Sequence, residues 1–374
     1  MASKYPVVKL GFRLGLVGIP ALVWMLWQWS LPLNQYTFRA WEALTAEGDY
    51  WNGTFFPNQR LELTEMGDLG PYTGDAVPKR TVWETDEDGY RNASGSCKDP
   101  EGIVVGDSTA AGSSLSQEET VTALLGRKRC VRSFAGSNFR FDIEHAFNLG
   151  YRPKWIYISV GDYVALPLSR IVRKFNHQNI KPGSESPIEF PYALTLYSRL
   201  RKNSYWNYRE SHGLMNSLRR SWVSPDDFMA EYPFGNMPKQ LFDEPESKLT
   251  PEHWSHDEVL EVIVGLDHLG RELEKLGTRL IVSFFPRKNS VYTDLSGVTK
   301  GRFGTTFLDE YERSRKEPGG VHFDYFDLIG KFQRHYEKTR EFLHHSDDTH
   351  WNPAGVRIAV DELEKRLSAM GYAK

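Results

Sequence analysis

A serine and a histidine separated by more than two hundred residues have surroundings that suit nucleophilic catalysis. Ser108 lies in the stretch 106–112, which reads GDSTAAG and directly follows a short apolar run. His350 lies in the stretch 347–352, which reads DDTHWN. A serine hydroxyl becomes a useful nucleophile when a histidine takes its proton and a carboxylate orients that histidine. The two residues need only meet in space, so their separation along the chain is no argument against such a pair.

The segments around these motifs have the pattern of an α/β protein. Short apolar, β-branched runs predict strands at 102–106, 130–134, 155–159 and 279–285. Helices are expected from a capping box at 116–119 through 125, at 142–149, at 259–276 with Gly277 as its cap, and from Asn352 onward. This alternation predicts a parallel sheet covered by helices on both faces, a three-layer α/β/α fold. Ligands of such sheets bind beyond the carboxyl ends of the strands, where Ser108 is placed.

Four stretches of the chain resemble the sequence blocks of the SGNH/GDSL hydrolase superfamily. IVVGDSTAAG at 103–112 resembles the first block and DDTHWNPAG at 347–355 the last. FAGSN at 134–138 is similar to the second block, and SVGD at 159–162 falls at the place of the third. The resemblance covers about residues 86–374 without much of the middle, and it implies a flavodoxin-like parallel sheet.

The same resemblance implies a role for each matching residue. Ser108 would be the nucleophile, His350 the base and Asp347 the carboxylate that orients it, with Asp348 as the alternative acid. The backbone amides of Ser108 and Gly136 would donate to the oxyanion.

The third block departs from the family pattern. Asp162 and Tyr163 follow Gly161, where the family has its oxyanion-hole asparagine. Three alternatives stay open: the Tyr163 hydroxyl replaces that asparagine, Asn138 reaches into the site, or the hole has only two donors.

Two further features resemble the alginate-type polysaccharide O-acetyltransferases. These are the pair His350–Trp351 and the stretch 285–288, which reads FPRK and is followed by Val291–Tyr292. The likeness is partial, because in those enzymes the Asp–His segment precedes the serine. It implies that Lys288 and Trp351 lie on the substrate side of the site; the alternative is that Lys288 only lines a loop.

The N-terminal region has the pattern of a membrane anchor. Residues 14–33 contain no charged side chain, and roughly 20 apolar residues suffice to cross a bilayer as a helix. Basic residues precede this run and acidic residues follow it, which predicts a cytoplasmic segment 1–13, a transmembrane signal-anchor at 14–33 and the rest of the chain outside the cytoplasm. A cleaved signal peptide is the alternative. We expect a loosely packed membrane-proximal stem at 34–95 and a catalytic domain at 96–374 with an insertion at about 164–255.

Cysteine content, charge and motifs limit the other possibilities. Cys97 and Cys130 precede predicted neighbouring strands, so a disulfide and two free thiols are both open. The formal net charge of −3 gives no reason to expect nucleic acid as a partner. No sequence pattern predicts a metal or a nucleotide cofactor.

The sequence therefore predicts a membrane-anchored, extracytoplasmic or periplasmic serine esterase or acyltransferase that acts on O-acylated glycans, O-acetylated ones above all. A polysaccharide export or acetylation complex is a candidate partner. A lipid or thioester esterase is one alternative, and a non-catalytic glycan-binding or scaffold module of an export complex is another.

Overall fold

The computed structural model describes most of the second half of the chain and the region around residue 100. The described residues are 18–20, 22–23, 55–67, 69, 76–136, 139–185, 229–234, 237–243, 254–296 and 303–372. Side chains are described for most of these, with Tyr163 and the residues of 229–243 among the exceptions.

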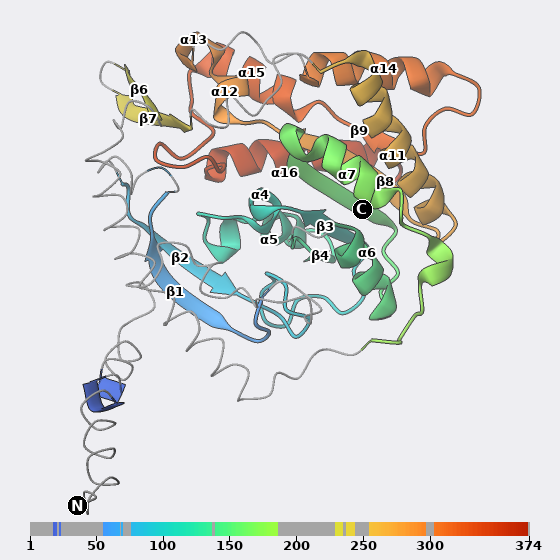
Figure 1. The fold of residues 1–374 in the computed structure, drawn as a ribbon, viewed down its shortest axis with the longest axis horizontal. Coiled ribbons are helices and arrows are strands. Elements are labelled where there is room, and N and C mark those ends of the chain that lie inside the picture. The colour runs from blue at the N-terminus through green and yellow to red at the C-terminus, as the bar shows by residue number, and fades with distance from the viewer. Residues whose placement is uncertain are drawn as a thin grey trace, which may run out of the picture.

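A five-stranded parallel sheet forms the centre of the fold (Figure 1). Its strands are β3 (Gly102–Gly106), β4 (Val131–Ser133), β5 (Trp155–Gly161), β8 (Arg279–Phe285) and β9 (Phe323–Tyr325), in the spatial order β4-β3-β5-β8-β9. This order is the flavodoxin-like one. The four predicted strands are confirmed, and β9, a three-residue strand at the edge of the sheet, is an addition.

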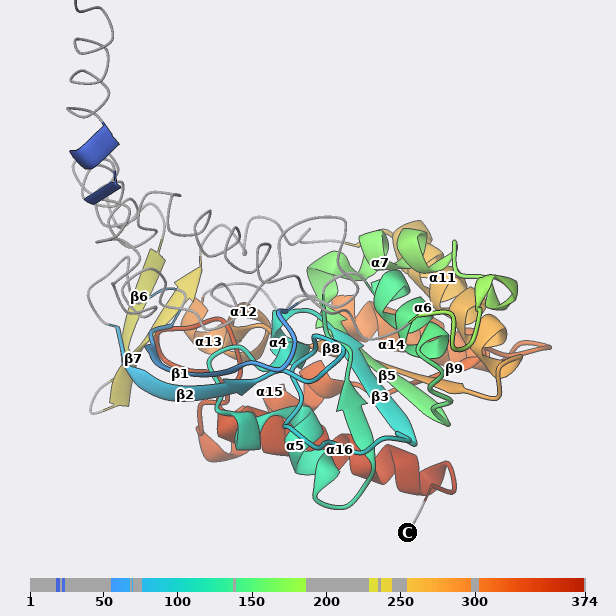
Figure 2. The ribbon, with the colours of Figure 1, turned by 90° about the horizontal axis from the view of Figure 1, so that it is seen from below.

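Helices cover both faces of the sheet, so it is the middle of three layers (Figures 1 and 2). Alternate residues of the strands point to opposite faces, with Val104 and Ile281 on one and Ile103 and Val282 on the other. The first face packs against α4 (Ser108–Ala111), α5 (Val121–Gly126), α15 (Leu328–Thr339) and α16 (Pro353–Ala369). The second packs against α6 (Phe139–Asn148), α7 (Ala165–Val172), α11 (His256–Glu274) and α14 (Phe303–Lys316). The short helices are α12 (Lys288–Val291), α13 (Thr293–Ser296), η2 (Gln117–Glu119), η3 (Asp162–Val164) and η4 (His177–Asn179).

The predicted helix ends follow the expected capping chemistry, with one difference. The side chain of Asn352 accepts hydrogen bonds from the amides of Ala354 and Gly355 and begins α16. The capping box at Ser116 is present, but it opens only the short helix η2. Thr120 is extended (ψ 157°) and caps a separate helix, α5, so the helix predicted through residue 125 is divided in two.

Two antiparallel hairpins accompany the sheet: β1 (Arg60–Glu65) with β2 (Lys79–Glu84), and β6 (Met229–Phe234) with β7 (Met237–Asp243). The expectation of loose packing over 34–95 is wrong for the described part of that segment. Trp83 and Tyr90 are fully buried, and the ring of Phe55 meets that of Trp83 edge-on at 5.2 Å. α7 lies within the predicted insertion 164–255 yet packs in the main core through Ala165, Leu168 and Val172. Much of that insertion lies outside the described residues.

Cys97 and Cys130 form a disulfide with a Cα–Cα distance of 5.5 Å. Both precede their strands, so the bond lies at the amino ends of β3 and β4. Of the two alternatives that the sequence left open, the structure contains the disulfide.

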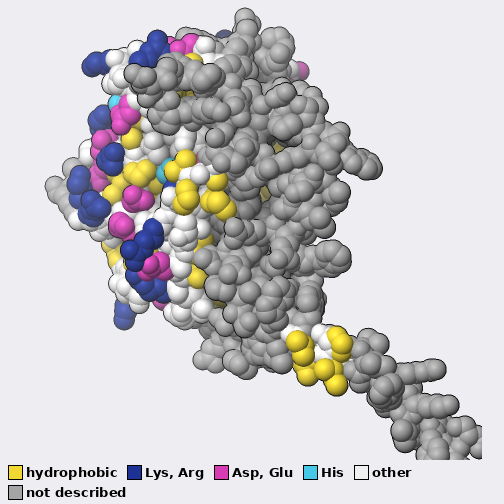
Figure 3. Space-filling model, turned by 90° about the vertical axis from the view of Figure 1, so that its left-hand side faces the viewer, with side chains coloured by type: hydrophobic (Ala, Val, Ile, Leu, Met, Phe, Trp, Pro, Cys, Tyr) yellow, Lys and Arg dark blue, Asp and Glu magenta, His cyan; other side chains and the backbone are white. Residues whose placement is uncertain are grey.

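Most of the predicted anchor 14–33 lies outside the described residues. Its described positions are helical, and Ile19, Leu22 and Val23 are more than half exposed, which gives an apolar surface on the N-terminal segment (Figure 3). Among the residues that the structure describes, no helix has the length and apolar character needed to cross a membrane.

Candidate active site

Ser108 lies on a tight turn at the carboxyl end of β3. It is the first residue of α4, whose N-cap, Asp107, accepts a hydrogen bond from the Thr109 amide at 3.0 Å. Two glycines make this turn possible. A Cβ on Gly106 would lie 2.3 Å from the carbonyl oxygen of Ser159 on the neighbouring strand, and Gly112 ends α4 with φ 81°.

His350 lies in the loop between α15 and α16. A β-bridge between His344 and Trp351 closes this loop, and the His345 amide donates to the His350 carbonyl oxygen at 3.2 Å. The Nε2 atom of His350 lies 2.8 Å from Oγ of Ser108. The spatial meeting that the two sequence motifs predict is therefore confirmed, at the carboxyl edge of the parallel sheet.

The carboxylate that contacts His350 is Asp348. Its Oδ1 lies 2.6 Å from Nδ1 of His350 and accepts the backbone amide of the same residue at 3.1 Å. The choice of Asp347 is therefore corrected in favour of its alternative. The side chain of Asp348 is fully buried, and that of His350 is nearly so.

Asp347 points the other way, to the β1–β2 hairpin. Its Oδ2 accepts the amides of Gly67 and Val77, each at 2.8 Å, and its Oδ1 pairs with Lys79 at 2.9 Å. The Leu69 amide donates to its carbonyl oxygen at 2.9 Å. These four contacts explain why Asp347 is unavailable to His350: they fasten the hairpin to the histidine loop.

The charge of Asp348 determines which ring nitrogen of His350 carries the proton. Burial alone would raise the pKa of Asp348, but the charge and hydrogen bond of His350, the Ser114 hydroxyl and Lys79 together hold that pKa well below its usual range. Asp348 is thus ionised and accepts a proton-bearing Nδ1. Nε2 is then left as the acceptor for the hydroxyl of Ser108, which is the tautomer that a general base requires.

Asp107 and Asp162 surround the place where the third block should supply an oxyanion donor. Asp107 Oδ2 accepts the Gly161 amide at 3.3 Å, which joins the nucleophile turn to the end of β5. Burial raises the pKa of Asp107 to about 6, against the opposing effects of the Thr109 and Gly161 amides. Asp162 pairs with Arg287 at 2.9 Å, and both side chains are buried.

Of the proposed oxyanion donors, Ser108 and Gly136 belong to the described residues. Gly136 follows β4, the strand beside β3, and so lies at the same edge of the sheet as Ser108. Asn138 and the side chain of Tyr163 lie outside the description, so the three alternatives for the missing asparagine stay open.

Lys288 and Trp351 support the histidine loop from within the core. Lys288 is 4% exposed and donates from Nζ to the Ser346 carbonyl oxygen at 3.0 Å. Trp351 is 2% exposed, donates from its indole to the Pro286 carbonyl oxygen at 3.3 Å and packs against Phe332. Both side chains are almost fully enclosed by protein, as is that of His350 itself, and their placement on the substrate side stays a prediction.

Three further residues at this site were not predicted from the sequence. Arg287 lies in the stretch FPRK just after the end of β8, so the rule that functional residues follow strands would have indicated it. Lys79 is the first residue of β2, and Ser114 lies in the loop after α4; neither belongs to a sequence motif. Only the folded chain brings them to Asp347 and Asp348.

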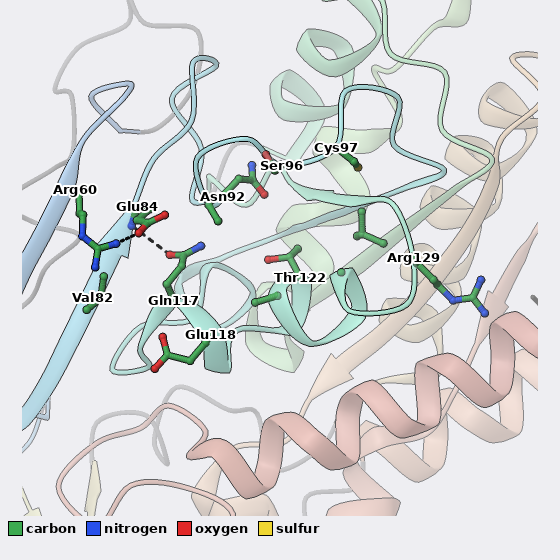
Figure 4. Close-up of a pocket in the computed structure, with 14 residues that line it drawn as sticks. Arg60, Val82, Glu84, Asn92, Ser96, Cys97, Gln117, Glu118, Thr122 and Arg129 are labelled. Atoms are coloured by element: carbon green, nitrogen blue, oxygen red, sulfur yellow. Dashed lines mark hydrogen bonds and ion pairs between the residues drawn. The ribbon is translucent and has the colours of Figure 1, made fainter.

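A pocket of about 480 Å³ lies elsewhere, beside the disulfide (Figure 4). β2, the loop 92–97, η2 and α5 supply its walls. Among its lining residues, Arg60 pairs with Glu84, Arg129 pairs with Glu364, and the side chain of Gln117 accepts the Glu84 amide at 3.2 Å. None of Ser108, Asp348 and His350 lines it, so it is separate from the serine–histidine pair.

Comparison with known proteins bears on the C-terminal part of the chain. Residues 239–373 match a family model described as the SGNH hydrolase-like domain of acetyltransferase AlgX. A search of curated proteins found no match. The matched segment contains Asp348 and His350 but not Ser108. The chain thus carries, at residues 239–373, a domain similar to the SGNH hydrolase-like domain of acetyltransferase AlgX, which confirms the family resemblance drawn from its motifs.

Proposed function

We propose that this protein is a serine esterase or acyltransferase that uses Ser108, His350 and Asp348 as its catalytic triad. The observation that carries the proposal is the unbroken hydrogen-bonded path from Ser108 Oγ through both ring nitrogens of His350 to Asp348, with distances of 2.8 and 2.6 Å. The similarity of residues 239–373 to an SGNH hydrolase-like acetyltransferase domain supports this class of chemistry.

The triad geometry leads to a two-step reaction. Ser108 Oγ attacks the acyl carbonyl of an ester while Nε2 of His350 takes the hydroxyl proton. The imidazolium, stabilised by Asp348, then returns that proton to the departing alcohol oxygen, leaving an acyl-enzyme. Water or a sugar hydroxyl attacks the acyl-enzyme by the reverse path, which gives hydrolysis or acyl transfer.

The backbone amides of Ser108 and Gly136 are the proposed donors to the oxyanion of each tetrahedral intermediate. One such donor is worth roughly 3–4 kcal/mol of transition-state stabilisation where it has been removed by mutation. Arg287 is buried and pairs with Asp162 at 2.9 Å, and this scheme assigns it no role at the oxyanion.

We further propose that the protein works outside the cytoplasm on O-acylated glycans, O-acetylated ones above all, tethered by the apolar segment 14–33. The disulfide supports an oxidising compartment, and the charge pattern around residues 14–33 supports this orientation. The matched family description, which names an acetyltransferase, supports acetyl as the group handled.

The test is labelling of the full-length protein with a fluorophosphonate, together with release of acetate from a small acetyl ester. We expect labelling and hydrolysis in the wild type and loss of both in Ser108→Ala and His350→Ala. Absence of labelling in the wild type, or its persistence in Ser108→Ala, would contradict the proposal. A Ser108→Ala protein with full biological activity would instead support the non-catalytic module.

The substrate class needs a separate comparison. Acetyl esters of an oligosaccharide should be consumed faster than long-chain esters and thioesters, and an added unacetylated glycan should capture acetyl groups if the enzyme is a transferase. Preference for long acyl chains would favour the lipid or thioester esterase. Mass spectrometry of the glycan distinguishes transfer from hydrolysis.

A further inference from the structure

Ser114 combines a strained backbone with a buried contact to the proposed triad acid. Its φ of 62° lies in the left-handed region, which few residues other than glycine adopt, and its side chain is 6% exposed. From that position its hydroxyl donates to Oδ2 of Asp348. Non-glycine residues held in this region cost about 1 kcal/mol or more and concentrate at functional sites.

The two oxygens of Asp348 have different partners. Oδ1 faces the ring and the amide of His350, and Oδ2 takes the hydroxyl of Ser114. Without the second contact, the carboxylate could rotate about its Cβ–Cγ bond and lose its alignment with Nδ1 of His350. We propose that Ser114 is a positioning residue, a fourth member of a Ser114–Asp348–His350–Ser108 chain, which holds Oδ1 of Asp348 on the histidine ring.

A buried arginine keeps Ser114 in place. The guanidinium of Arg91 donates to the carbonyl oxygens of Ala111 and Leu115, at 3.1 and 2.6 Å, and to that of Gly112 between them. It also stacks over the ring of Trp83, with 3.7 Å from its central carbon to the ring centroid. The loop 111–115 is therefore clamped on both sides of Ser114, which explains how the strained conformation is maintained.

The inference deepens the proposed function and rests on it, but its geometric core can be tested without catalysis. The ionised carboxylate of Asp348 stabilises the imidazolium form of His350 while its Oδ1 faces Nδ1. A carboxylate that rotates away from the ring stabilises that form less. The pKa of His350 should therefore fall when Ser114 loses its hydroxyl.

The first measurement uses full-length protein that carries Ser108→Ala, so that no activity is required. The ring resonances of His350 are followed by NMR across pH, and His350→Gln in the same background identifies them among the eleven histidines. Ser114→Ala and Ser114→Gly should both lower the pKa of His350. Glycine relaxes the strained backbone, so agreement between the two variants attributes the effect to the hydroxyl.

Ser113→Ala is the matched control, because Ser113 is the preceding residue, is similarly buried at 2%, and its hydroxyl is not the one that bonds Asp348. It should leave the titration unchanged. An unchanged or raised pKa of His350 in both Ser114 variants would overturn the inference, whatever the protein's activity.

The second measurement uses the protein with Ser108 intact. Ser114→Ala should lower kcat by about tenfold or more, since hydrogen bonds to charged groups are worth about 1.5–3 kcal/mol, with KM unchanged. The acidic limb of the pH profile should move to lower pH, which a general loss of folded protein would not cause. Wild-type protein without Ser108-dependent labelling would contradict the proposed function alone, whereas equal kcat and pH profiles in Ser114→Ala would contradict the positioning role alone.

Discussion

Two adjacent aspartates in the histidine loop face different partners, although they share charge, size and burial. Asp348 is bonded to His350 and Ser114, and Asp347 is bonded to Lys79 and two amides of the hairpin loop. Asp348 therefore orients the histidine of the proposed proton transfer, and Asp347 attaches the hairpin to the loop.

Replacement of each aspartate by asparagine should separate these roles. In Asp348→Asn an NH₂ group, which cannot accept a hydrogen bond, replaces one carboxylate oxygen. Where this group faces Nδ1, it favours the wrong tautomer of His350; comparable substitutions cost about 10⁴-fold in kcat. Asp347→Asn should cost less than about tenfold in kcat but should lower the melting temperature, because the pair with Lys79 is lost. Ester hydrolysis and thermal unfolding of both variants provide the measurement. Equal losses of kcat would show that the hydrogen-bond pattern does not decide the catalytic acid.

At the scale of elements, the carboxyl edge of the sheet collects the site from segments far apart in sequence. β3 supplies Ser108, the loop before α16 supplies Asp348 and His350, and the β1–β2 hairpin anchors that loop. The hairpin touches the loop closely enough that a Cβ on Gly67 would lie 2.1 Å from the carbonyl oxygen of Asp347.

Gly67→Ala should therefore push the hairpin away from the histidine loop. We expect a loss of about 1–3 kcal/mol in the free energy of unfolding, typical of overpacking, and a lower kcat because Asp348 follows Asp347 directly. Urea unfolding and ester hydrolysis measure the two effects. Gly126→Ala is the control, since a Cβ there meets nothing within 4 Å and alanine suits the end of a helix. Equal stability of the two variants would contradict a tight hairpin contact.

The sequence predicts the elements that have strong local patterns. Four strands, the helix α11 with its cap at Gly277 and the start of α16 each repeat a period or a capping motif over several residues. β9 and the burial of Trp83 escape prediction because they depend on packing against distant segments.

The same distinction applies to the site. Ser108 and His350 lie in recognisable motifs, and their meeting could be predicted. The choice between Asp347 and Asp348 could not, because it depends on where the amides of Gly67 and Val77 come to lie. Ser114 has no local pattern that distinguishes it from Ser113.

At the scale of the whole molecule, the disulfide and the serine–histidine pair lie at opposite ends of the sheet. Cys97 and Cys130 precede β3 and β4, and Ser108 follows β3. Stability and chemistry should therefore respond separately to reduction.

Cys97→Ser with Cys130→Ser should lower the free energy of unfolding by about 3–4 kcal/mol, from the loop-closure entropy of the 33-residue separation. The reaction rate of the folded fraction with a fluorophosphonate should stay within about twofold of the wild type, because the triad geometry does not depend on the bond. Denaturant unfolding and labelling kinetics test the two statements. A large loss of labelling in fully folded double mutant would show that the two ends of the sheet are coupled.

Acid should destabilise the molecule through His344. Burial, assisted by the charge of Lys288, lowers the pKa of His344 to about 3, while the unfolded chain has a value near 6.5. The unfolded state therefore binds more protons between these values, so stability is lost as pH falls from about 6.5 toward 3, by roughly 3 kcal/mol at pH 4. His344→Gln should be less stable at pH 7 but should lose less on acidification.

Melting temperatures at pH 7, 5.5 and 4 measure this effect, with the more exposed His335 as the site of a control His335→Gln variant. If wild-type and His344→Gln curves run parallel across this range, the acid sensitivity has another source.

The separation of Ser108 from His350 along the chain has a consequence for how the site forms. His350 follows Ser108 by 242 residues, and Asn352, the N-cap of α16, donates to the carbonyl oxygens of Phe342 and His344 in the loop that holds it. While the chain is being synthesised, Ser108 therefore lacks the base proposed for it until this loop has formed. We expect a protein that ends before His350 to carry an intact GDS motif without the histidine that would take the proton of its serine.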